Sequence, residues 1–305
     1  MCFTKRDVIL EFWNSEITPD EWSSGRLNIL PKKGDLKNVN NYRGIMLLET
    51  FYKIAANILH ARLLPIAENI DQEPQCGFRP VRSCMDAIFA LRLALKKRKE
   101  HDLESWVLFI DLVKAFDRVP RPMLWCVLKK FGVPPKSVCL LMSLHDPVHV
   151  HFTVAGIPKT FSNTIGVKQG DTLGPLLFTY YIAAIMLLWR KSTRTKPCIF
   201  RTSNDFQLAG RRPKTQGDLF IFRDSEYADD TAALFSDRED LELGTVELIQ
   251  MFGRFGMQIH TGSEGKQSKS EAMFVPKHTH SYNDPESMTT PTNSQLTLEI
   301  RPSFR

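Results

Sequence analysis

Residues 225–235 read Ser-Glu-Tyr-Ala-Asp-Asp-Thr-Ala-Ala-Leu-Phe and set two adjacent aspartates, Asp229 and Asp230, between apolar runs. We interpret the stretch as two strands joined by a tight turn, because neighbouring side chains on a strand otherwise point to opposite faces. Two like charges held side by side repel each other unless a cation lies between them. An ordinary surface turn is the alternative interpretation, since aspartate is common in turns.

A third acidic residue changes the balance between these interpretations. Asp111 follows the apolar and β-branched run 106–110, which we expect to be a buried strand. Burying an unpaired carboxylate is costly, so a cation, an arginine or solvent must meet the end of this strand. Together with Asp229 and Asp230, Asp111 would offer oxygen ligands from two strands to hard divalent ions. A pair of such ions forms the kind of site that transfers phosphoryl groups.

The composition agrees with this chemistry without deciding it. The chain has 305 residues and is 43% hydrophobic, enough to bury a core in two or three lobes. Its net charge of +6 suits a polyanionic partner, although such a charge is common. The six cysteines lack C-x-x-C spacing and no secretory signal precedes them. We therefore expect free thiols and an intracellular protein, in the nucleus or the cytoplasm, that is not secreted.

The run 176–189 is mostly apolar, but its 14 residues fall short of the roughly 20 that span a bilayer. We expect it to be a core helix, and we expect no membrane partner. Further helices are predicted at 51–69 (interrupted near Pro65), 83–100, 123–131, 136–145 and 236–255, the last opened by a capping box of Ser236 and Glu239. Strands are predicted at 149–154 and 219–222. Helices on one side of a small antiparallel sheet make an α+β fold.

Two charged or metal-binding patterns leave alternatives open. His149 and His151 share a face of the strand 149–154, and without a third ligand nearby we interpret them as a half-exposed strand face rather than a metal site. The helix 83–100 ends in four basic residues at 96–99. These cations either complement the helix dipole in solvent or contact template phosphates.

Six sequence blocks follow one another in a fixed order. They lie at 25–48, 75–87, 106–117, 166–178, 227–230 and 255–271, and include Arg-Gly-Ile-Met-Leu-Leu, Lys-Ala-Phe-Asp and Tyr-Ala-Asp-Asp. In this order they resemble the reverse transcriptase of a non-LTR (LINE-type) retrotransposon, from about residue 22 to about residue 276. The resemblance implies the fingers and palm of a right-hand polymerase, with a small antiparallel palm sheet backed by helices and the thumb absent. It assigns 1–21 to an N-terminal extension, 22–105 to fingers, 106–276 to palm with a fingers return near 150–175, and 277–305 to a disordered tail.

The resemblance also implies a two-metal nucleotidyl transfer. Asp111 and Asp229 would bind two Mg²⁺ ions, with Mn²⁺ as a possible substitute, and Asp230 would be the third carboxylate. The backbone carbonyl of Leu112 would complete the second site. Lys269 matches the position proposed to protonate the leaving pyrophosphate, with Lys266 as the alternative.

A nucleotide-binding set follows from the same blocks. It comprises Lys32, Lys33, Arg43, Phe116, Gln169, Gly170 and Tyr227. The ring of Phe116 would exclude a 2′-hydroxyl and so select deoxynucleotides, although plain core packing is its other explanation. Lys32, Lys33 and Arg43, the basic residues of the fingers, would bind the triphosphate, or they are solvated surface residues. Asp171 stands where many relatives carry Cys, which affects the local contact near Gly170.

The expected partners are an RNA template, a DNA primer and deoxynucleoside triphosphates. Full-length relatives add an endonuclease and a thumb, and neither is recognisable here, so we expect a truncated copy with poor processivity. Two alternatives remain open. One is a group II intron-like reverse transcriptase that also acts as a maturase, and the other is a non-enzymatic relic that at most binds RNA.

Overall fold

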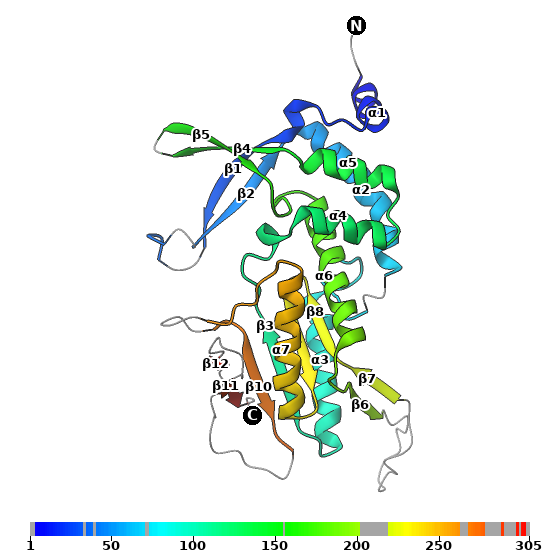
Figure 1. The fold of residues 1–305 in the computed structure, drawn as a ribbon, viewed down its shortest axis with the longest axis vertical. Coiled ribbons are helices and arrows are strands. Elements are labelled where there is room, and N and C mark those ends of the chain that lie inside the picture. Colours follow the sequence, from blue (N-terminus) through cyan, green and yellow to red (C-terminus); the bar gives the residue numbers. More distant parts are fainter. Residues whose placement is uncertain are drawn as a thin grey trace. The chain divides into compact units, whose positions relative to one another are not determined.

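The computed structural model describes residues 4–32, 35–38, 41–70, 73–154, 156–201, 219–262, 268–277, 288–289, 297–298 and 300–302. The chain divides into two compact units, one of residues 1–72 and 114–184 and one of residues 73–113 and 185–305 (Figure 1). Each unit contains helices and a sheet, which confirms the expected α+β class. The chain crosses between units at other positions than the expected fingers and palm boundaries, so those two assignments stay predictions.

The first unit is built around a four-stranded sheet in the order β2-β1-β4-β5. Strands β1 and β4 are parallel, and the other two pairs are antiparallel. The strands are β1 (Ser24–Pro31), β2 (Tyr42–Leu48), β4 (Val148–Val154) and β5 (Ile157–Asn163). The helices are α1 (Lys5–Ser15), α2 (Thr50–Glu68), α4 (Arg121–Lys130) and α5 (Pro135–His145), with short 3-10 turns η1 (Asp20–Ser23) and η3 (Phe116–Arg118).

The second unit holds a five-stranded sheet in the order β13-β10-β3-β9-β8. Its strands are β3 (Ser105–Ile110), β8 (Asp224–Tyr227), β9 (Asp230–Phe235), β10 (Glu271–Val275) and β13 (Ile300–Pro302), flanked by the pair β6 (Cys198–Arg201) and β7 (Leu219–Phe222) and the pair β11 (Met288–Thr289) and β12 (Thr297–Leu298). All neighbours in the five-stranded sheet are antiparallel except β10 and β13. The strands expected near Asp111 and around the Asp229–Asp230 turn are therefore confirmed.

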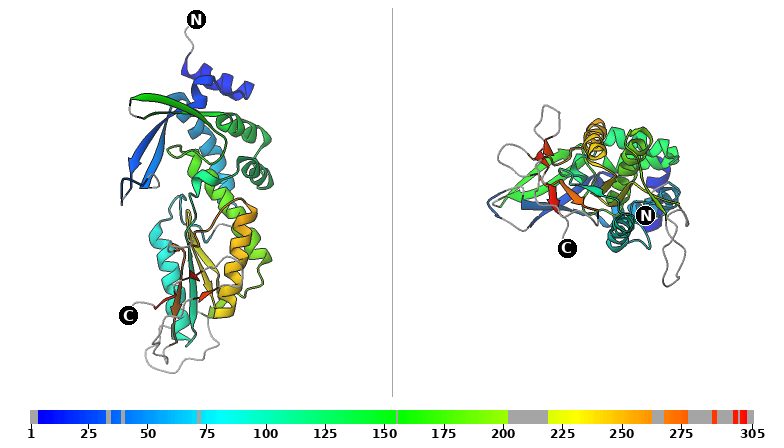
Figure 2. Two further views of the ribbon diagram at one scale, coloured as in Figure 1. Left: turned by 60° about the vertical axis from the view of Figure 1, so that its left-hand side comes forward. Right: turned by 90° about the horizontal axis from the view of Figure 1, so that it is seen from below.

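Helices α3 (Cys84–Glu100) and α7 (Arg238–Arg254) cover opposite faces of this sheet (Figures 1 and 2). Val107 and Leu234 form a core cluster with Ala94 of α3. Phe235, which points the other way on β9, packs against Gly244 of α7. The expectation of helices on one side of the sheet is wrong for this unit, because residues 231–235 are buried on both faces and both faces need a cover.

Helix α6 (Leu173–Ser192) passes from the first unit into the second. Within the described part of the chain it is long and apolar enough to cross a membrane by length and composition, but 72% of its apolar window is buried inside the protein. This burial confirms the predicted core helix, which is longer than the expected range 176–189. The carboxylate of Asp171 accepts from the amide of Leu173 at 3.2 Å, so the helix begins earlier than its apolar run.

Three local predictions can be checked against the structure. Helix α2 continues through Pro65 to Glu68, so the expected interruption is wrong; the missing amide of Pro65 removes one helical hydrogen bond without ending the helix. Helix α7 is capped by Asp237, not Ser236, because the Asp237 carboxylate accepts from the amide of Asp240 at 2.8 Å. The expected disordered tail 277–305 is described at Lys277 and in β11, β12 and β13; its remainder lies outside the described residues.

Candidate active site

The two adjacent aspartates lie at a two-residue hairpin connection in the second unit. Tyr227 pairs with Asp230, so Ala228 and Asp229 form the loop between β8 and β9. Ala228 has a φ of 58°, which the primed turns of two-residue hairpins require at this position and which glycine usually supplies. The backbone of Ala228 is therefore held in a conformation that an alanine side chain disfavours.

The pairing register brings Asp111 to this turn. Ile110 of β3 pairs with Thr231 of β9, so the next residues along the two strands, Asp111 and Asp230, face each other across the ladder. Opposite Cα atoms in such ladders lie about 4.5 to 5.5 Å apart. Burial raises the pKa of Asp230, and the negative charges of Asp229 and Asp111 raise it further. The three carboxylates therefore share one electrostatic environment.

The backbone of Asp111 is also fixed on its other side. The amide of His260 donates to the carbonyl of Asp111 at 2.8 Å, and the amide of Val113 donates to the carbonyl of Gln258 at 2.8 Å. These two bonds flank the bridge between Leu112 and Ile259. Because backbone groups alternate along a strand, the carbonyl of Leu112 points to the opposite edge, where β9 lies. This is the direction that a backbone ligand beside Asp229 and Asp230 would need.

These residues suit a divalent cation by their chemistry. Carboxylate and backbone oxygens are the ligands that Mg²⁺ prefers, and the pKa of Asp230, which burial raises and the charges of Asp229 and Asp111 raise further, is one that a nearby cation would lower. In the described ranges, however, no three His, Cys, Asp or Glu side chains form a cluster with the spacing to hold a metal ion. The structure thus gives the strand register of an acidic site, and it does not give a closed coordination shell.

Lys269 lies next to the strand of Asp111. Its amide donates to Nδ1 of His260 at 3.3 Å, and its neighbour Ser270 accepts from the amide of Asp111 at 3.1 Å. The Lys269 side chain is exposed at this end of the sheet. The alternative, Lys266, lies outside the described residues.

The first unit contains most of the nucleotide-binding candidates. The amide nitrogen of the Gln169 side chain donates to Asp117 at 3.1 Å. Burial raises the pKa of Asp117, while Lys114, Gln169 and Lys32 lower it. Lys32 and Gln169 therefore act on the same carboxylate. Asp117 was not identified as a site residue from the sequence, although it belongs to the Lys-Ala-Phe-Asp block.

Gly170 lies in close contact with the backbone of β2. It has a φ of 103°, and a Cβ at this position would lie 2.7 Å from the carbonyl oxygen of Met46. The carbonyl of Gln169 accepts from the amide of Met46 at 2.9 Å. Any side chain at position 170 would therefore separate this loop from β2.

The remaining candidates have mixed surroundings. Phe116 stacks on Phe178, with ring centroids 4.4 Å apart, so packing within the first unit accounts for its position. Arg43 is exposed on β2, and Tyr227 is partly exposed at the end of β8. Lys33 lies outside the described residues. The two strand histidines bond across to β5, His151 to Thr160 and His149 to Ser162, which confirms the half-exposed strand face.

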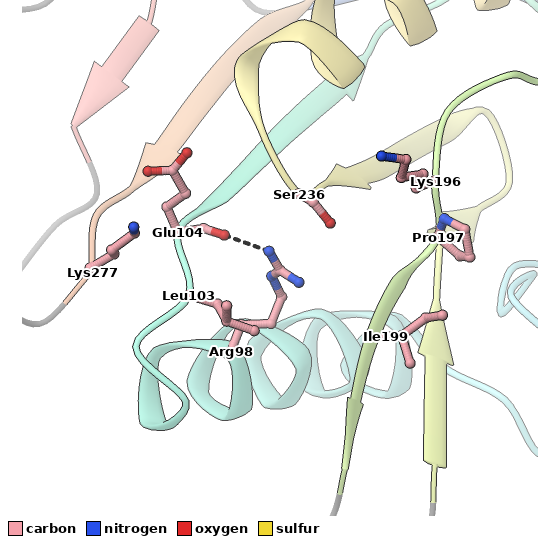
Figure 3. A pocket seen from close by; sticks show the side chains of 8 residues that line it. All are labelled: Arg98, Leu103, Glu104, Lys196, Pro197, Ile199, Ser236 and Lys277. Carbon is pink, nitrogen blue, oxygen red and sulfur yellow. Dashed lines mark hydrogen bonds between the residues drawn. The ribbon is translucent and has the colours of Figure 1, made fainter. Parts of the chain in front are cut away.

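A pocket of about 560 Å³ opens at the other end of β3 (Figure 3). Its lining includes Lys196, Lys277 and Ser236. β3 has six residues, so the pocket and Asp111 are separated by about 20 Å at about 3.3 Å per residue. None of the predicted site residues lines this pocket, and its chemistry is separate from that of the aspartates.

The basic end of α3 is partly explained by contacts near this pocket. Arg98 is buried and donates to the Ser105 hydroxyl at 2.8 Å. It also donates to the Glu104 carbonyl at 2.6 Å (Figure 3). Lys97 pairs with Glu100 at 2.8 Å. These contacts favour the structural explanation for Lys97 and Arg98 over contact with template phosphates.

Known proteins resemble this chain in sequence and in fold. The chain is 30% identical over 220 residues to the "Transposon TX1 uncharacterized 149 kDa protein" of Xenopus laevis, which covers 71% of this chain and 15% of that protein. It is 27% identical over 224 residues to the "Probable RNA-directed DNA polymerase from transposon BS" of Drosophila melanogaster, covering 72% and 22%. It thus spans less than a quarter of either relative.

A solved telomerase from Candida tropicalis, truncated from its C-terminal domain, shares the fold with a TM-score of 0.56. The identity is 11%, and the match covers 95% of this chain and 58% of that one, so the likeness concerns the fold alone. Residues 30–280 match the profile of the family described as "Reverse transcriptase (RNA-dependent DNA polymerase)". The chain therefore belongs to the reverse transcriptase family and is related to the polymerases of non-LTR retrotransposons.

Proposed function

We propose that this chain catalyses RNA-directed DNA synthesis, adding deoxynucleotides to a DNA primer on a retrotransposon RNA template. The pairing of β3 with β9 supports this proposal, because it aligns Asp111 with Asp230 at the turn that carries Asp229. The matched relatives are transposon proteins, which supports the retrotransposon assignment over a group II intron-like one.

The acidic residues would hold the metal, and other residues would hold the substrates. Asp111, Asp229 and Asp230, with the carbonyl of Leu112, would bind Mg²⁺, or Mn²⁺ in its place. When bound, the two ions would lower the pKa of the primer 3′-hydroxyl and neutralise charge on the triphosphate. Catalysis would then rest on positioning and on charge neutralisation.

The remaining candidates have roles that suit their chemistry. Lys32, Lys33 and Arg43 would bind the triphosphate, and Gln169 and Gly170 would contact the incoming nucleotide. Phe116 and Tyr227 would lie near its sugar and base, with Phe116 disfavouring a 2′-hydroxyl. Lys269 would donate a proton to the pyrophosphate as it leaves.

Primer extension on an RNA template with Mg²⁺ tests the proposal. We expect extension by the unmodified chain and a loss of at least about a hundredfold with Asp111→Asn or Asp229→Asn, since each change removes a charged metal ligand. Asp102→Asn is the matched control, because Asp102 is exposed and has a φ of 57°, which asparagine tolerates. Absence of extension by every protein, with RNA binding retained, would favour the non-enzymatic relic.

A further inference from the structure

The turn that carries Asp229 is held by a second segment of the chain, residues 74–77. Within the second unit, Gln75 forms a parallel bridge with Glu226 of β8. The amide of Cys76 donates to the carbonyl of Glu226, and the amide of Glu226 donates to the carbonyl of Pro74, both at 2.8 Å. The last residues of β8 are thus paired on one edge with β9 and on the other with this segment.

The Gln75 side chain bonds to the backbone of the turn itself. Its carbonyl oxygen accepts from the amide of Ala228 at 2.9 Å and from the amide of Gly77 at 2.7 Å. Its amide nitrogen donates to the carbonyl of Ala228 and to a carboxylate oxygen of Glu226, each at 3.3 Å. The buried Gln75 side chain therefore satisfies both the amide and the carbonyl of Ala228, the residue with positive φ.

Glu226 is in turn held by a cation. Arg190, near the end of α6, forms ion pairs with Asp224 and with Glu226, and both carboxylates are almost fully buried. Arg190 thereby offsets one of two negative charges that are costly to bury beside Gln75, while burial and the neighbouring Asp224 still raise the pKa of Glu226 well above its ordinary value. The contacts run from Arg190 through Glu226 and Gln75 to Ala228, the residue before Asp229.

Gly77 lies directly against the backbone of the turn. A Cβ on Gly77 would lie 2.2 Å from the amide nitrogen of Ala228. The segment therefore packs directly against the backbone of the turn, and a displacement of either one displaces the other.

We propose that Gln75 is a positioning residue for the Asp229–Asp230 turn and that Glu226, paired with Arg190, orients Gln75. The proposal rests on the proposed function insofar as this turn carries metal ligands. Gln75 touches no reacting atom, and it acts by keeping Ala228 in its left-handed conformation, which sets where Asp229 and Asp230 present their carboxylates.

An exchange of polar groups tests this arrangement. Gln75→Glu keeps the acceptor for both amides but removes the donor to the Ala228 carbonyl and places a second carboxyl group against Glu226, whereas Glu226→Gln replaces the partner carboxyl group by an amide. The double variant restores a donor opposite an acceptor, because the new amide at position 226 can donate to the new carboxylate at position 75. We expect Gln75→Glu to lower kcat by about tenfold or more while changing KM for the nucleotide less than about threefold. The double variant should recover part of that loss, because it restores the contact between positions 75 and 226 but not the donor to the Ala228 carbonyl.

Hydrogen–deuterium exchange and Mn²⁺ binding provide readouts that need no activity. We expect Gln75→Met to speed exchange of the Ala228 amide by at least about tenfold, because a buried hydrogen bond is lost, and to weaken Mn²⁺ binding. Peptides from 105–110 should exchange as before, which would show that the sheet is intact. Gln250→Glu, an exposed change on α7, is the control.

Two results would overturn the proposal. One is an unchanged exchange rate at Ala228 in Gln75→Met, and the other is a double variant no better than Gln75→Glu. If the unmodified chain extends no primer, the proposed function fails, but the exchange rate of the Ala228 amide in Gln75→Met still decides the role of Gln75.

Discussion

At the scale of single residues, three carboxylates and their partial burial set the electrostatics of the site. Asp111 and Asp230 face each other by strand register, and Asp229 lies in the adjoining turn. The raised pKa of Asp230 is the consequence of burial and of these two neighbours. A group with a raised pKa keeps its proton to a higher pH. Protons therefore compete with cations for Asp230 at pH values above the ordinary pKa of aspartate.

Asp229→Asn should change the pH dependence of cation binding as well as its strength. Removing the Asp229 charge removes one cause of the raised pKa of Asp230, so the acidic limb of Mn²⁺ binding should move to lower pH. Affinity at neutral pH should also fall, because a ligand is lost. Titration of Mn²⁺ by electron paramagnetic resonance between about pH 4 and pH 7 measures both effects. An acidic limb that stays in place or moves upward would contradict the assigned charge coupling.

The close packing of Gly77 gives a second prediction at this scale. Gly77→Ala should lower the melting temperature and reduce extension activity by at least about tenfold, because the new Cβ meets the backbone of Ala228 at 2.2 Å. Gly253→Ala on α7 is the matched control, since a Cβ there meets nothing within 4 Å. That change should be neutral or should stabilise by up to about 1 kcal/mol, as alanine favours helix. Equal losses in both variants would contradict this account.

At the scale of helices and strands, sequence patterns located the elements better than their ends and partners. The apolar run before Asp111 and the turn at Asp229 predicted β3, β8 and β9, because buried strands have local signatures. The pair β1 and β2 was not predicted as strands, since most of its side chains are intermediate or exposed and show no clear alternation. Gln75 could not be placed at the turn from the sequence, because its partner lies 153 residues away.

The N-terminus of α7 provides the test at this scale. Ser236 matches the capping-box pattern, but Asp237 makes the capping bond and Ser236 instead contacts the Cys198 thiol. Asp237→Ala should therefore destabilise the protein by about 0.5–2 kcal/mol, whereas Ser236→Ala should cost less. Urea denaturation of the two variants at equal ionic strength compares them. A larger loss with Ser236→Ala would restore the cap assigned from the sequence.

At the scale of the whole molecule, the ordered blocks predicted the family, and the structure added how each unit is held together. The blocks alone placed Lys32, Gln169 and Gly170 in one functional set, and within the first unit these residues meet around Asp117 and Met46. The same blocks gave no sign that Lys168, next to Gln169, is buried. Its amine donates to the carbonyl of Leu144 at 2.7 Å and lies 4.1 Å from the centre of the Tyr52 ring.

Lys168 makes the stability of the chain depend on pH. Burial lowers the pKa of Lys168 to about 7, and Arg121 lowers it as well, while Asp171 and Asp146 oppose the shift. An unfolded lysine titrates near pH 10.4, so between about pH 7 and pH 10 the unfolded chain binds more protons than the folded one. The free energy of unfolding should therefore rise with pH across this window, and below about pH 7 the cost of burying a charged amine is fully present.

Lys168→Met removes this titration and isolates its effect. The variant should gain stability relative to the unmodified chain at pH 6.5, less the cost of leaving the Leu144 carbonyl and Asp171 without the amine, and the difference should shrink by a few kcal/mol, roughly, as pH rises to 9. Thermal or urea unfolding at matched ionic strength measures the trend. Lys159→Met, at an exposed position of β5, should differ from the unmodified chain by the same amount at every pH. A Lys168→Met difference that is equally flat would show that the amine titrates alike in the folded and unfolded chains, and that burial does not govern its charge.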